Sequence, residues 1–387
     1  MKIYDAFFSL LRTEILGETM PIEAFSDFTE EEFVSLYNLS KSQDLVHLVG
    51  DGLSRTGVLL PEKLQQAFTK QQMLAVYRCE RNRDAYERVC ALFEENGIDF
   101  MPLKGTLIRP YYPEPWMRTS CDIDILIHEE DLERAIALIF AHFDVKKREE
   151  KNYHDVPLLI NQNIHLELHF NLDENIEATD AVLARVWENA TLQEGWKHCY
   201  VQSNEFLLLH LVAHNACHFI RGGCGARPFL DWWILMGNFS FDKELFNALV
   251  AEAQLTEFLD AMSLLTDVWF SGKAHTELTQ TMEAYILSAG IYGSLDNHMI
   301  VVREKRGGRF GFIFKRIFLP YNDLKEGYPR LKRAPILYPY YTVVRWFRLI
   351  FRGWGERASY SFRVAAAPET EHTQSIKKMF YDLKLLK

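Results

Sequence analysis

Cysteine is scarce in this sequence. The 387 residues include six cysteines, and none of them forms a C-x-x-C pair. A small secreted domain held together by disulfides would need a much higher density of cysteine, and a zinc ribbon would need the missing pairs. The six thiols are therefore expected to be reduced and mostly buried.

A long apolar run is also missing. The first 18 residues are rich in apolar side chains but include Asp5, Arg12 and Glu14, and no small-residue cleavage site follows them. Neither a signal peptide nor a membrane-spanning helix fits these features. The sequence predicts a cytoplasmic protein without a transmembrane segment.

Positive charge is not in excess. The chain has 43 Lys and Arg against 53 Asp and Glu, which gives a formal net charge of −10. A general electrostatic attraction of the whole protein to nucleic acid or to anionic lipid is therefore not expected. A local basic surface remains compatible with this total.

The rest of the composition is that of a globular protein, with 48% hydrophobic and 25% charged residues. Apolar residues recur at helical spacing up to about residue 96, and the segment from Pro61 to Gly97 predicts one long helix. Short apolar runs then alternate with helical segments, which is typical of an α/β unit. The predicted parts are a helical N-terminal lobe (1–96), an α/β core (97–172), a helical domain (173–302) and a basic, aromatic-rich segment (303–387).

Individual elements follow from the same patterns. Strands are predicted over 98–103, 121–128, 156–160 and 163–170. Helices are predicted over 129–143, 178–190, 204–220, 227–239 and, after a short polar stretch at 366–374, over 375–387.

Two aspartates stand in one predicted strand, in the order Asp122, Ile123, Asp124. Alternate residues of a strand project to the same face, so the two carboxylates lie side by side while Ile123 points into the core. Two like charges held together repel each other unless a cation lies between them. Such a pair suits a hard divalent ion, Mg²⁺ above all, with phosphate and water as further ligands. The alternative is a strand end with two solvated acids.

Lys104, Gly105 and Thr106 follow an apolar strand and precede a predicted helix. A glycine there lets backbone N–H groups approach a phosphate, and the helix amino terminus adds a positive dipole. Lys104 adds a point charge. An ordinary turn is the alternative interpretation.

A third acid, Glu167, is predicted on a later strand, with His165 and His169 on the same face. Three acids on neighbouring strands are typical of two-metal phosphoryl transfer, and a glutamate can also act as the general base. A half-exposed sheet face with polar residues is the alternative.

Together these features resemble the polymerase-β-like nucleotidyltransferase superfamily and, more narrowly, the bacterial family labelled uncharacterised nucleotidyltransferase. The resemblance extends over roughly residues 20–290. The motifs that carry it are Leu103-Lys104-Gly105, Arg118, Asp122-Ile123-Asp124 and Glu167-Leu168-His169-Phe170.

The resemblance implies a minimal nucleotidyltransferase core at 97–172, with a mixed sheet, between helical N- and C-terminal lobes. It implies Asp122, Asp124 and Glu167 as catalytic metal ligands for Mg²⁺ or Mn²⁺. Substrate-binding roles are predicted for Lys104, Gly105, Thr106, Arg118 and His169. The chain departs from the superfamily in having Gly-Thr at the turn and 17 residues between Gly105 and Asp122. Arg118 either grips phosphate or steadies the two aspartates through an ion pair.

Other candidates are less specific. His210, His214 and His218 recur on one helical face, which is compatible with zinc, with a nucleotide pocket, or with packing in the helical domain. Asp231 and the two tryptophans after it either close the pocket or lie in the core. His154 is a further candidate for the same cleft.

The segment 303–363 has 15 Lys and Arg against four Asp and Glu, and aromatic residues are interleaved with them. Its part 336–357 is predicted to contact an anionic membrane surface, single-stranded nucleic acid, or the acidic remainder of the chain.

The sequence thus predicts transfer of a nucleoside monophosphate from an NTP, such as ATP, to an unidentified hydroxyl or amine of a small molecule, protein or RNA. The alternative is a non-catalytic nucleotide-binding or membrane-recruited scaffold that retains the fold.

Overall fold

A computed structural model describes most of the chain. The described residues form two compact units. The first takes in the chain up to Cys217 together with Gly225–Thr279, and the second takes in His218–Cys224 together with the chain after Thr279. The four predicted domains remain a prediction. The described residues are 3–161, 163–305, 307, 308, 311, 314, 318–328, 330–352 and 370–386.

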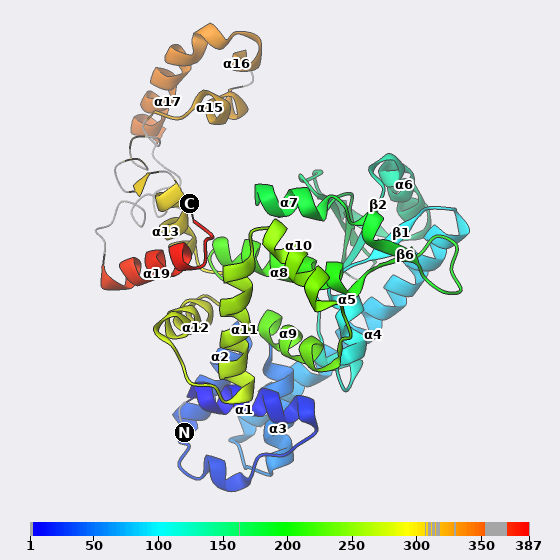
Figure 1. Ribbon diagram of the computed structural model, residues 1–387, viewed down its shortest axis with the longest axis vertical. Coiled ribbons are helices and arrows are strands. Elements are labelled where there is room, and N and C mark those ends of the chain that lie inside the picture. Colours follow the sequence, from blue (N-terminus) through cyan, green and yellow to red (C-terminus); the bar gives the residue numbers. More distant parts are fainter. Residues whose placement is uncertain are drawn as a thin grey trace. The chain divides into compact units, whose positions relative to one another are not determined.

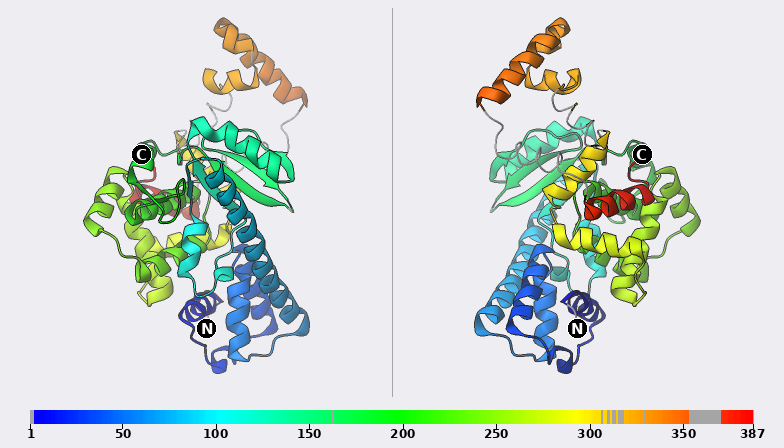
Figure 2. Two further views of the ribbon diagram at one scale, coloured as in Figure 1. Left: turned by 90° about the vertical axis from the view of Figure 1, so that its right-hand side faces the viewer. Right: turned by 90° about the vertical axis from the view of Figure 1, so that its left-hand side faces the viewer.

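Helices dominate the chain up to residue 95, as the apolar spacing predicts. The 34-residue helix that follows Pro61 ends just before Gly97, whose φ of 65° is a left-handed conformation that glycine adopts without strain. Figure 2 shows this long helix running from the other N-terminal helices to the sheet. The bounds are α1 Ile3–Leu16, α2 Glu30–Ser42, α3 Val46–Thr56 and α4 Glu62–Glu95.

The larger sheet has five strands in the order β1-β2-β5-β4-β3. β2 and β5 are parallel, whereas the other neighbours are antiparallel, so the sheet is mixed. A mixed sheet among helices confirms the predicted fold class (Figure 1). The strands are β1 Phe100–Pro102, β2 Asp122–Ile127, β3 Val145–Arg148, β4 Asp155–Ile160 and β5 Ile164–His169.

The two faces of this sheet differ in character. Ile123 and Ile125 of β2 are buried in an aliphatic core, which also contains residues from the last part of α4 and from α6 (Leu132–His142). Each fully buried aliphatic side chain contributes roughly 1.5–3 kcal/mol to folding, so this face fixes the register of the strands. Asp122 and Asp124 project from the opposite face because successive residues of a strand alternate.

The edge strands differ from the sequence predictions. The strand predicted over 98–103 is shorter, and it lies at the edge of the sheet, where Pro102 is tolerated. β3 is not predicted, because its sequence VKKR lacks the apolar alternation of a half-buried strand. Its exposed lysines at the other edge hinder pairing with a second chain.

Helices return after this sheet. The helix predicted over 178–190 ends at Leu183, and Ala190 begins a short strand that pairs with β7. This strand pairing overrides the helical spacing of the segment. Trp269 packs against Phe8 and thereby joins α11 to α1. The bounds are α7 Glu177–Leu183, β6 Ala190–Leu192, β7 Tyr200–Gln202, α8 Asn204–Ile220, α9 Arg227–Asn238, α10 Lys243–Glu252 and α11 Thr256–Ser271.

The second unit is helical where it is described. The ring of Tyr285 packs against Phe219 and Phe380, and its hydroxyl donates to the Phe219 carbonyl oxygen at 2.9 Å. Gly222 has a φ of +118°, and a Cβ at this position would lie 2.5 Å from the Ser294 carbonyl oxygen. The bounds are α12 Glu277–Ala289, α13 Leu295–Lys305, α15 Tyr321–Gly327, α16 Arg330–Arg333, α17 Tyr338–Arg352 and α19 Glu371–Asp382.

The last helix begins earlier than predicted. Thr370 Oγ1 accepts a hydrogen bond from the Thr373 N–H and so caps α19, which places residues 370–374 at the start of the helix and not in a polar linker. The part of the predicted contact segment after Arg352 lies outside the described residues, as does the linker up to residue 369. Within the described ranges, no helix is both long and apolar enough to cross a membrane.

Candidate functional site

Two parallel strands carry the predicted acids. In the ladder between β2 and β5, Asp124 is directly opposite Glu167, and Asp122 is opposite His165. Because alternate residues share a face, Asp122, Asp124 and Glu167 all project from the side of the sheet away from the aliphatic core. The structure thus brings the three predicted acids together.

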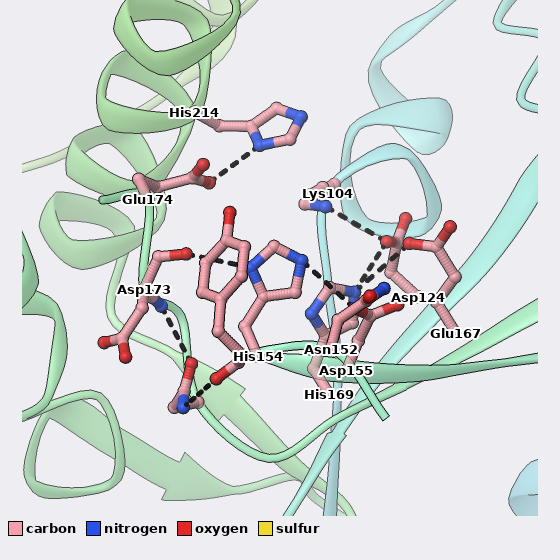
Figure 3. Close-up of polar contacts among 12 residues, drawn as sticks. Lys104, Asp124, Asn152, His154, Asp155, Glu167, His169, Asp173, Glu174 and His214 are labelled. Carbon is pink, nitrogen blue, oxygen red and sulfur yellow. Dashed lines mark hydrogen bonds and ion pairs between the residues drawn. The ribbon is translucent and has the colours of Figure 1, made fainter. Parts of the chain in front are cut away.

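The closest group at this site includes a histidine. One ligand atom from each of Asp124, Glu167 and His169 lies within 4.8 Å of the others. His169 Nε2 donates to Asp124 Oδ1 at 3.0 Å and lies 3.5 Å from Glu167 Oε2 (Figure 3). Asp124 and His169 are buried, whereas Glu167 is partly exposed. His169, predicted to bind substrate, therefore contacts the acids directly.

Asp122 and Asp124 have opposite electrostatic environments. The Asp124 carboxylate, burial and Glu167 together raise the pKa of Asp122 to about 6. Burial alone would also raise the pKa of Asp124, but Lys104 and His169 outweigh burial and hold that pKa well below its usual range. The site therefore contains one strongly stabilised carboxylate beside one that is repelled.

Lys104 is the cation at the centre of the site. Its Nζ donates to Asp124 Oδ1 at 3.1 Å (Figure 3). Burial opposes its positive charge, but Asp124, Glu174 and Asp122 raise the pKa of Lys104 above its usual value. Its backbone has a φ of 46° and a ψ of −116°, a region that a residue with a Cβ rarely adopts. Such local strain is typical of functional positions.

Gly105 and Thr106 begin a helix of one turn, α5 (Gly105–Ile108). The dipole of so short a helix is smaller than the sequence suggests. The backbone of Gly105 does not require glycine, and a Cβ there would meet Ser120 at 3.5 Å and Arg118 at 3.6 Å, which are ordinary contacts. Within the described residues, the Thr106 hydroxyl makes no hydrogen bond.

Arg118 is anchored away from the two aspartates. Its Nε donates to Asp231 Oδ1 at 2.7 Å, and its Nη1 donates to the Thr119 carbonyl oxygen at 2.6 Å. Tyr112 donates to the same Asp231 oxygen at 2.7 Å. The direct ion pair of Arg118 is thus with Asp231 of α9, and not with Asp122 or Asp124.

A family model matches the chain from the cap of α2 to the end of α11. The match spans residues 29–271, more than half of the chain, and the family is described as uncharacterised nucleotidyltransferase. The chain belongs to this family. Membership confirms the resemblance at the family level and supports a nucleotidyl transfer activity, while placement in the polymerase-β-like superfamily remains a prediction. Comparisons with curated proteins and with solved structures give no match.

The sequence patterns do not predict one acid of the site. Glu174 lies in the loop after β5, is buried, and accepts a hydrogen bond from His214 Nδ1 at 2.7 Å (Figure 3). Burial opposes its charge, but His214 and then Lys104 hold its pKa well below the usual range. Glu174 therefore offers Lys104 a second negative neighbour.

Two of the three candidate histidines of α8, His210 and His214, belong to the groups that surround the acids. His210 is buried, its Nδ1 has no hydrogen-bond partner among the residues that the structure describes, and burial lowers its pKa to about 3, so it is neutral. His214 pairs with Glu174. Within the described residues, the group that could hold a metal includes none of the α8 histidines, so a zinc site formed by His210, His214 and His218 finds no support.

His154 lies beside the acids, as the sequence allows. Its ring centroid is 5.4 Å from that of His169, and its Nδ1 donates to the Asp173 carbonyl oxygen at 2.9 Å. The two tryptophans after Asp231 instead pack on other aromatic side chains, Trp232 against Phe246 and Trp233 against Phe270. These contacts favour the core interpretation for both rings.

Proposed function

We propose that this chain transfers a nucleoside monophosphate from an NTP to a hydroxyl or amine acceptor and releases pyrophosphate. The observation that carries the proposal is the convergence of Asp122, Asp124 and Glu167 on one face of two adjacent parallel strands. The three carboxylates suit the positive charge of a metal ion, and the buried lysine beside them suits the negative charge of the triphosphate that the ion accompanies.

The residues fit a divalent cation. Lys104 and His169 both bind Oδ1 of Asp124, and within the described part of the chain Oδ2 of Asp124 has no hydrogen-bond partner. The pKa of Asp122 is raised because the Asp124 carboxylate, burial and Glu167 together outweigh the nearby charge of Lys104. Asp122, Asp124 and Glu167 would supply the oxygen ligands that Mg²⁺ or Mn²⁺ prefers. When bound, the ion supplies positive charge that neutralises the phosphates.

His169 has a different role in this proposal. Its Nε2 proton is already donated to Asp124, so the histidine orients that carboxylate and is not needed as a ligand. Hydrogen bonds to Asp124 and Glu167 raise the pKa of His169 despite its burial and the nearby Lys104. Together with Lys104, His169 favours the ionised form of Asp124.

The triphosphate would be held by the chain's own donors. Lys104 offers an ammonium, and the backbone at Gly105 and the Thr106 hydroxyl offer further hydrogen bonds. Arg118 is fixed by Asp231 through Nε, and its Nη1 would lie 3.6 Å from a Cβ built on Gly105, so its guanidinium is a further candidate for contact with the phosphates.

In the chemical step, the acceptor oxygen or nitrogen attacks the α-phosphorus and the bond to the β-phosphate oxygen breaks. Pyrophosphate leaves with the electron pair. The acceptor's proton passes to Glu167, which is partly exposed and so accessible to an acceptor. Positioning and electrostatic stabilisation would supply most of the rate enhancement.

The alternative is a scaffold that binds nucleotide without catalysis. A chain that had abandoned the reaction would be expected to have lost at least one of the three acids, and this chain has all of them. The alternative predicts nucleotide binding without transfer.

Thermal unfolding tests the binding part of the proposal. A ligand of the native state raises the melting temperature, so the protein is heated with each NTP, with and without Mg²⁺. We expect stabilisation that requires both components and that Asp122→Asn abolishes. Asp84→Asn, on the exposed side of α4, is the matched control and should respond as the parent does. An unchanged melting temperature of the parent protein with every combination of NTP and Mg²⁺ would contradict the proposal.

Mass spectrometry then tests the transfer. The protein is incubated with an NTP, Mg²⁺ and a cell lysate, and products are searched for mass additions equal to a nucleoside monophosphate. Such an addition, absent with Asp124→Asn, would identify the donor and the acceptor class. Ion-dependent nucleotide binding without any addition would favour the scaffold.

A further inference from the structure

A carboxylate of α9 holds the guanidinium of Arg118 in place. Arg118 Nε donates to Asp231 Oδ1 at 2.7 Å, and the Tyr112 hydroxyl donates to the same oxygen at 2.7 Å. The side chains of Arg118 and Asp231 are 11% and 8% exposed. The ion pair fixes the rotamer of Arg118, because turning the guanidinium away would leave the buried carboxylate without its counter-charge.

One nitrogen of this guanidinium is not used by the described residues. A guanidinium carries five N–H donors. Within the described part of the chain, Nε of Arg118 donates to Asp231 and Nη1 donates to the Thr119 carbonyl oxygen, whereas Nη2 donates to no group. Buried polar groups of folded proteins are nearly always hydrogen-bonded. An arginine that only fixed the chain before β2 would be expected to use both terminal nitrogens, so the unused Nη2 indicates a ligand that accepts hydrogen bonds.

The position of the guanidinium suits a phosphate as that ligand. A Cβ built on Gly105 would lie 3.6 Å from Arg118 Nη1, so the guanidinium lies beside the turn that follows Lys104. Burial opposes the charge of Arg118, but Asp231 and further groups that include Asp122 raise its pKa above the usual value. Arg118 is thus a permanent cation next to the site. Its planar fork matches two oxygens of one phosphate group.

We propose that Asp231 is a positioning residue for the nucleotide, because it fixes Arg118 so that Nη2 binds the triphosphate near Lys104. This inference rests on the proposed function and adds to it a residue of α9, a helix outside the sheet. Because the rotamer of Arg118 is set before the nucleotide arrives, little side-chain entropy is lost on binding.

The contact is expected at the β- or γ-phosphate. The α-phosphate reacts and therefore lies at the acids of the sheet. The direct ion pair of Arg118 is with Asp231 and not with those acids, so its guanidinium would meet a phosphate farther from them. A nucleoside monophosphate lacks both outer phosphates and would not make this contact.

Calorimetric titration of the full chain with Mg²⁺ tests the inference. Dissociation constants are measured for the four ribonucleoside triphosphates and the corresponding monophosphates. For the triphosphate that the parent protein binds most tightly, Arg118→Met should raise the constant about ten-fold or more, since a hydrogen bond between charged groups is lost. Asp231→Asn should raise it about three- to ten-fold. In both variants the constant for the monophosphate should change less than about two-fold, because that ligand does not reach Arg118.

A conservative variant separates charge from geometry. Arg118→Lys keeps a positive charge but has a single ammonium, which Asp231 would hold. It should therefore bind the triphosphate as weakly as Arg118→Met does. Circular dichroism verifies that each variant is folded. If Asp231→Asn does not fold, Tyr112→Phe takes its place, because it removes only one hydrogen bond from Asp231 and should raise the constant about two-fold.

Arg227 of the same helix supplies the matched control. Its Nη2 donates to the Thr119 hydroxyl at 3.2 Å, and its ion pair is with Asp44, so it holds the same part of the chain through a different carboxylate. Arg227→Met should leave the ratio of the triphosphate and monophosphate constants unchanged, even where it lowers the free energy of unfolding.

Three results would overturn the inference. Equal weakening of both nucleotides in the Asp231 variant, or the same change of ratio in the Arg227 control, would show that Asp231 acts only through the fold. Unchanged triphosphate binding by Arg118→Met would remove the phosphate contact and leave the proposed function intact. Absence of any Mg²⁺-dependent nucleotide binding by the parent protein would refute the proposed function together with this inference.

Discussion

Asp122 and Asp124 lie two positions apart on one strand, yet the folded protein stabilises the negative charge of Asp124 and destabilises that of Asp122. Asp124 is 5% exposed and is paired with Lys104 and His169, whereas Asp122 faces two other carboxylates. In the sequence the two residues look equivalent, and both Asp→Asn changes would be expected to leave folding nearly intact. The structure changes that expectation for each of them.

We predict opposite effects of the two substitutions on the metal-free protein. Asp124→Asn leaves Lys104 without its main partner and should lower the free energy of unfolding by about 2–4 kcal/mol. Asp122→Asn removes a repelled charge and should raise it by up to about 1 kcal/mol near neutral pH. Urea denaturation measures both. Equal destabilisation by the two changes would show that the site is not polarised in this way.

Lys104 supplies, in the metal-free protein, the positive charge that Asp124 requires. We therefore predict that Lys104→Met destabilises the metal-free protein by about 2–4 kcal/mol. Mg²⁺ should raise the melting temperature of this variant more than that of the parent, because the ion then replaces a missing charge and does not compete with one. Lys147→Met, at an exposed position of β3, serves as the control. A smaller metal response in the Lys104 variant would refute this interpretation.

At the scale of single elements, α1 and α3 meet around a buried acid. Glu14 is 1% exposed, and its Oε1 accepts from Arg55 Nη2 at 2.6 Å. Burial and then Asp51 raise the pKa of Glu14 from its ordinary value of 4.5 to about 8, despite Arg55. The folded state thus keeps a proton that the unfolded state loses at lower pH.

This contact makes stability depend on pH. The stabilisation that protonated Glu14 contributes to the folded state is complete below pH 4.5 and is lost as the pH rises towards 8. Over that interval the unfolded chain binds fewer protons than the folded one. In the parent protein the free energy of unfolding should decline by on the order of 1–3 kcal/mol between pH 5 and 8 because of this group, and Glu14→Gln should remove that decline. Urea denaturation at several pH values measures it. Glu95→Gln, at an exposed position of α4, should keep the decline. An unchanged profile in the Glu14 variant would contradict the assignment.

The elements that hold the acids could be predicted from the sequence because each has a local signature. In β2 and in β5, aliphatic residues alternate with the acids. This alternation predicts both the strand and the face of the sheet from which the acids project. Glu174 and His214 could not be paired, because a loop and a helix 40 residues apart meet only through the tertiary fold. The same holds for Arg118 and Asp231, which lie 113 residues apart. Long-range polar pairs have no local pattern.

At the scale of the whole molecule, the matched family region and the structural units do not coincide. The match runs through residue 271, but His218–Cys224, inside it, belong to the second unit. There Phe219 is fully buried and packs against Tyr285 and Phe380. The second unit therefore takes part of its core from within the family region, towards its C-terminal end.

We predict that a chain ending at Thr279 exposes apolar surface. It would retain Phe219 but lose the two rings that cover it. Such a chain should bind more of an anilinonaphthalene sulfonate dye than the full chain does, as measured by fluorescence. Adding Phe219→Ser to the shortened chain should reduce that excess. Equal dye binding by the short and full chains would show that Phe219 finds other cover.

The parallel pairing of β2 with β5 also bears on the order of folding. Asp124 and Glu167 lie 43 positions apart in the sequence and become neighbours only when β5 joins β2 in the sheet. Contacts between distant parts of a chain form late, because the entropy of closing the loop must be lost first. A cation held by these carboxylates would therefore lower the rate constant of unfolding and leave the rate constant of refolding unchanged.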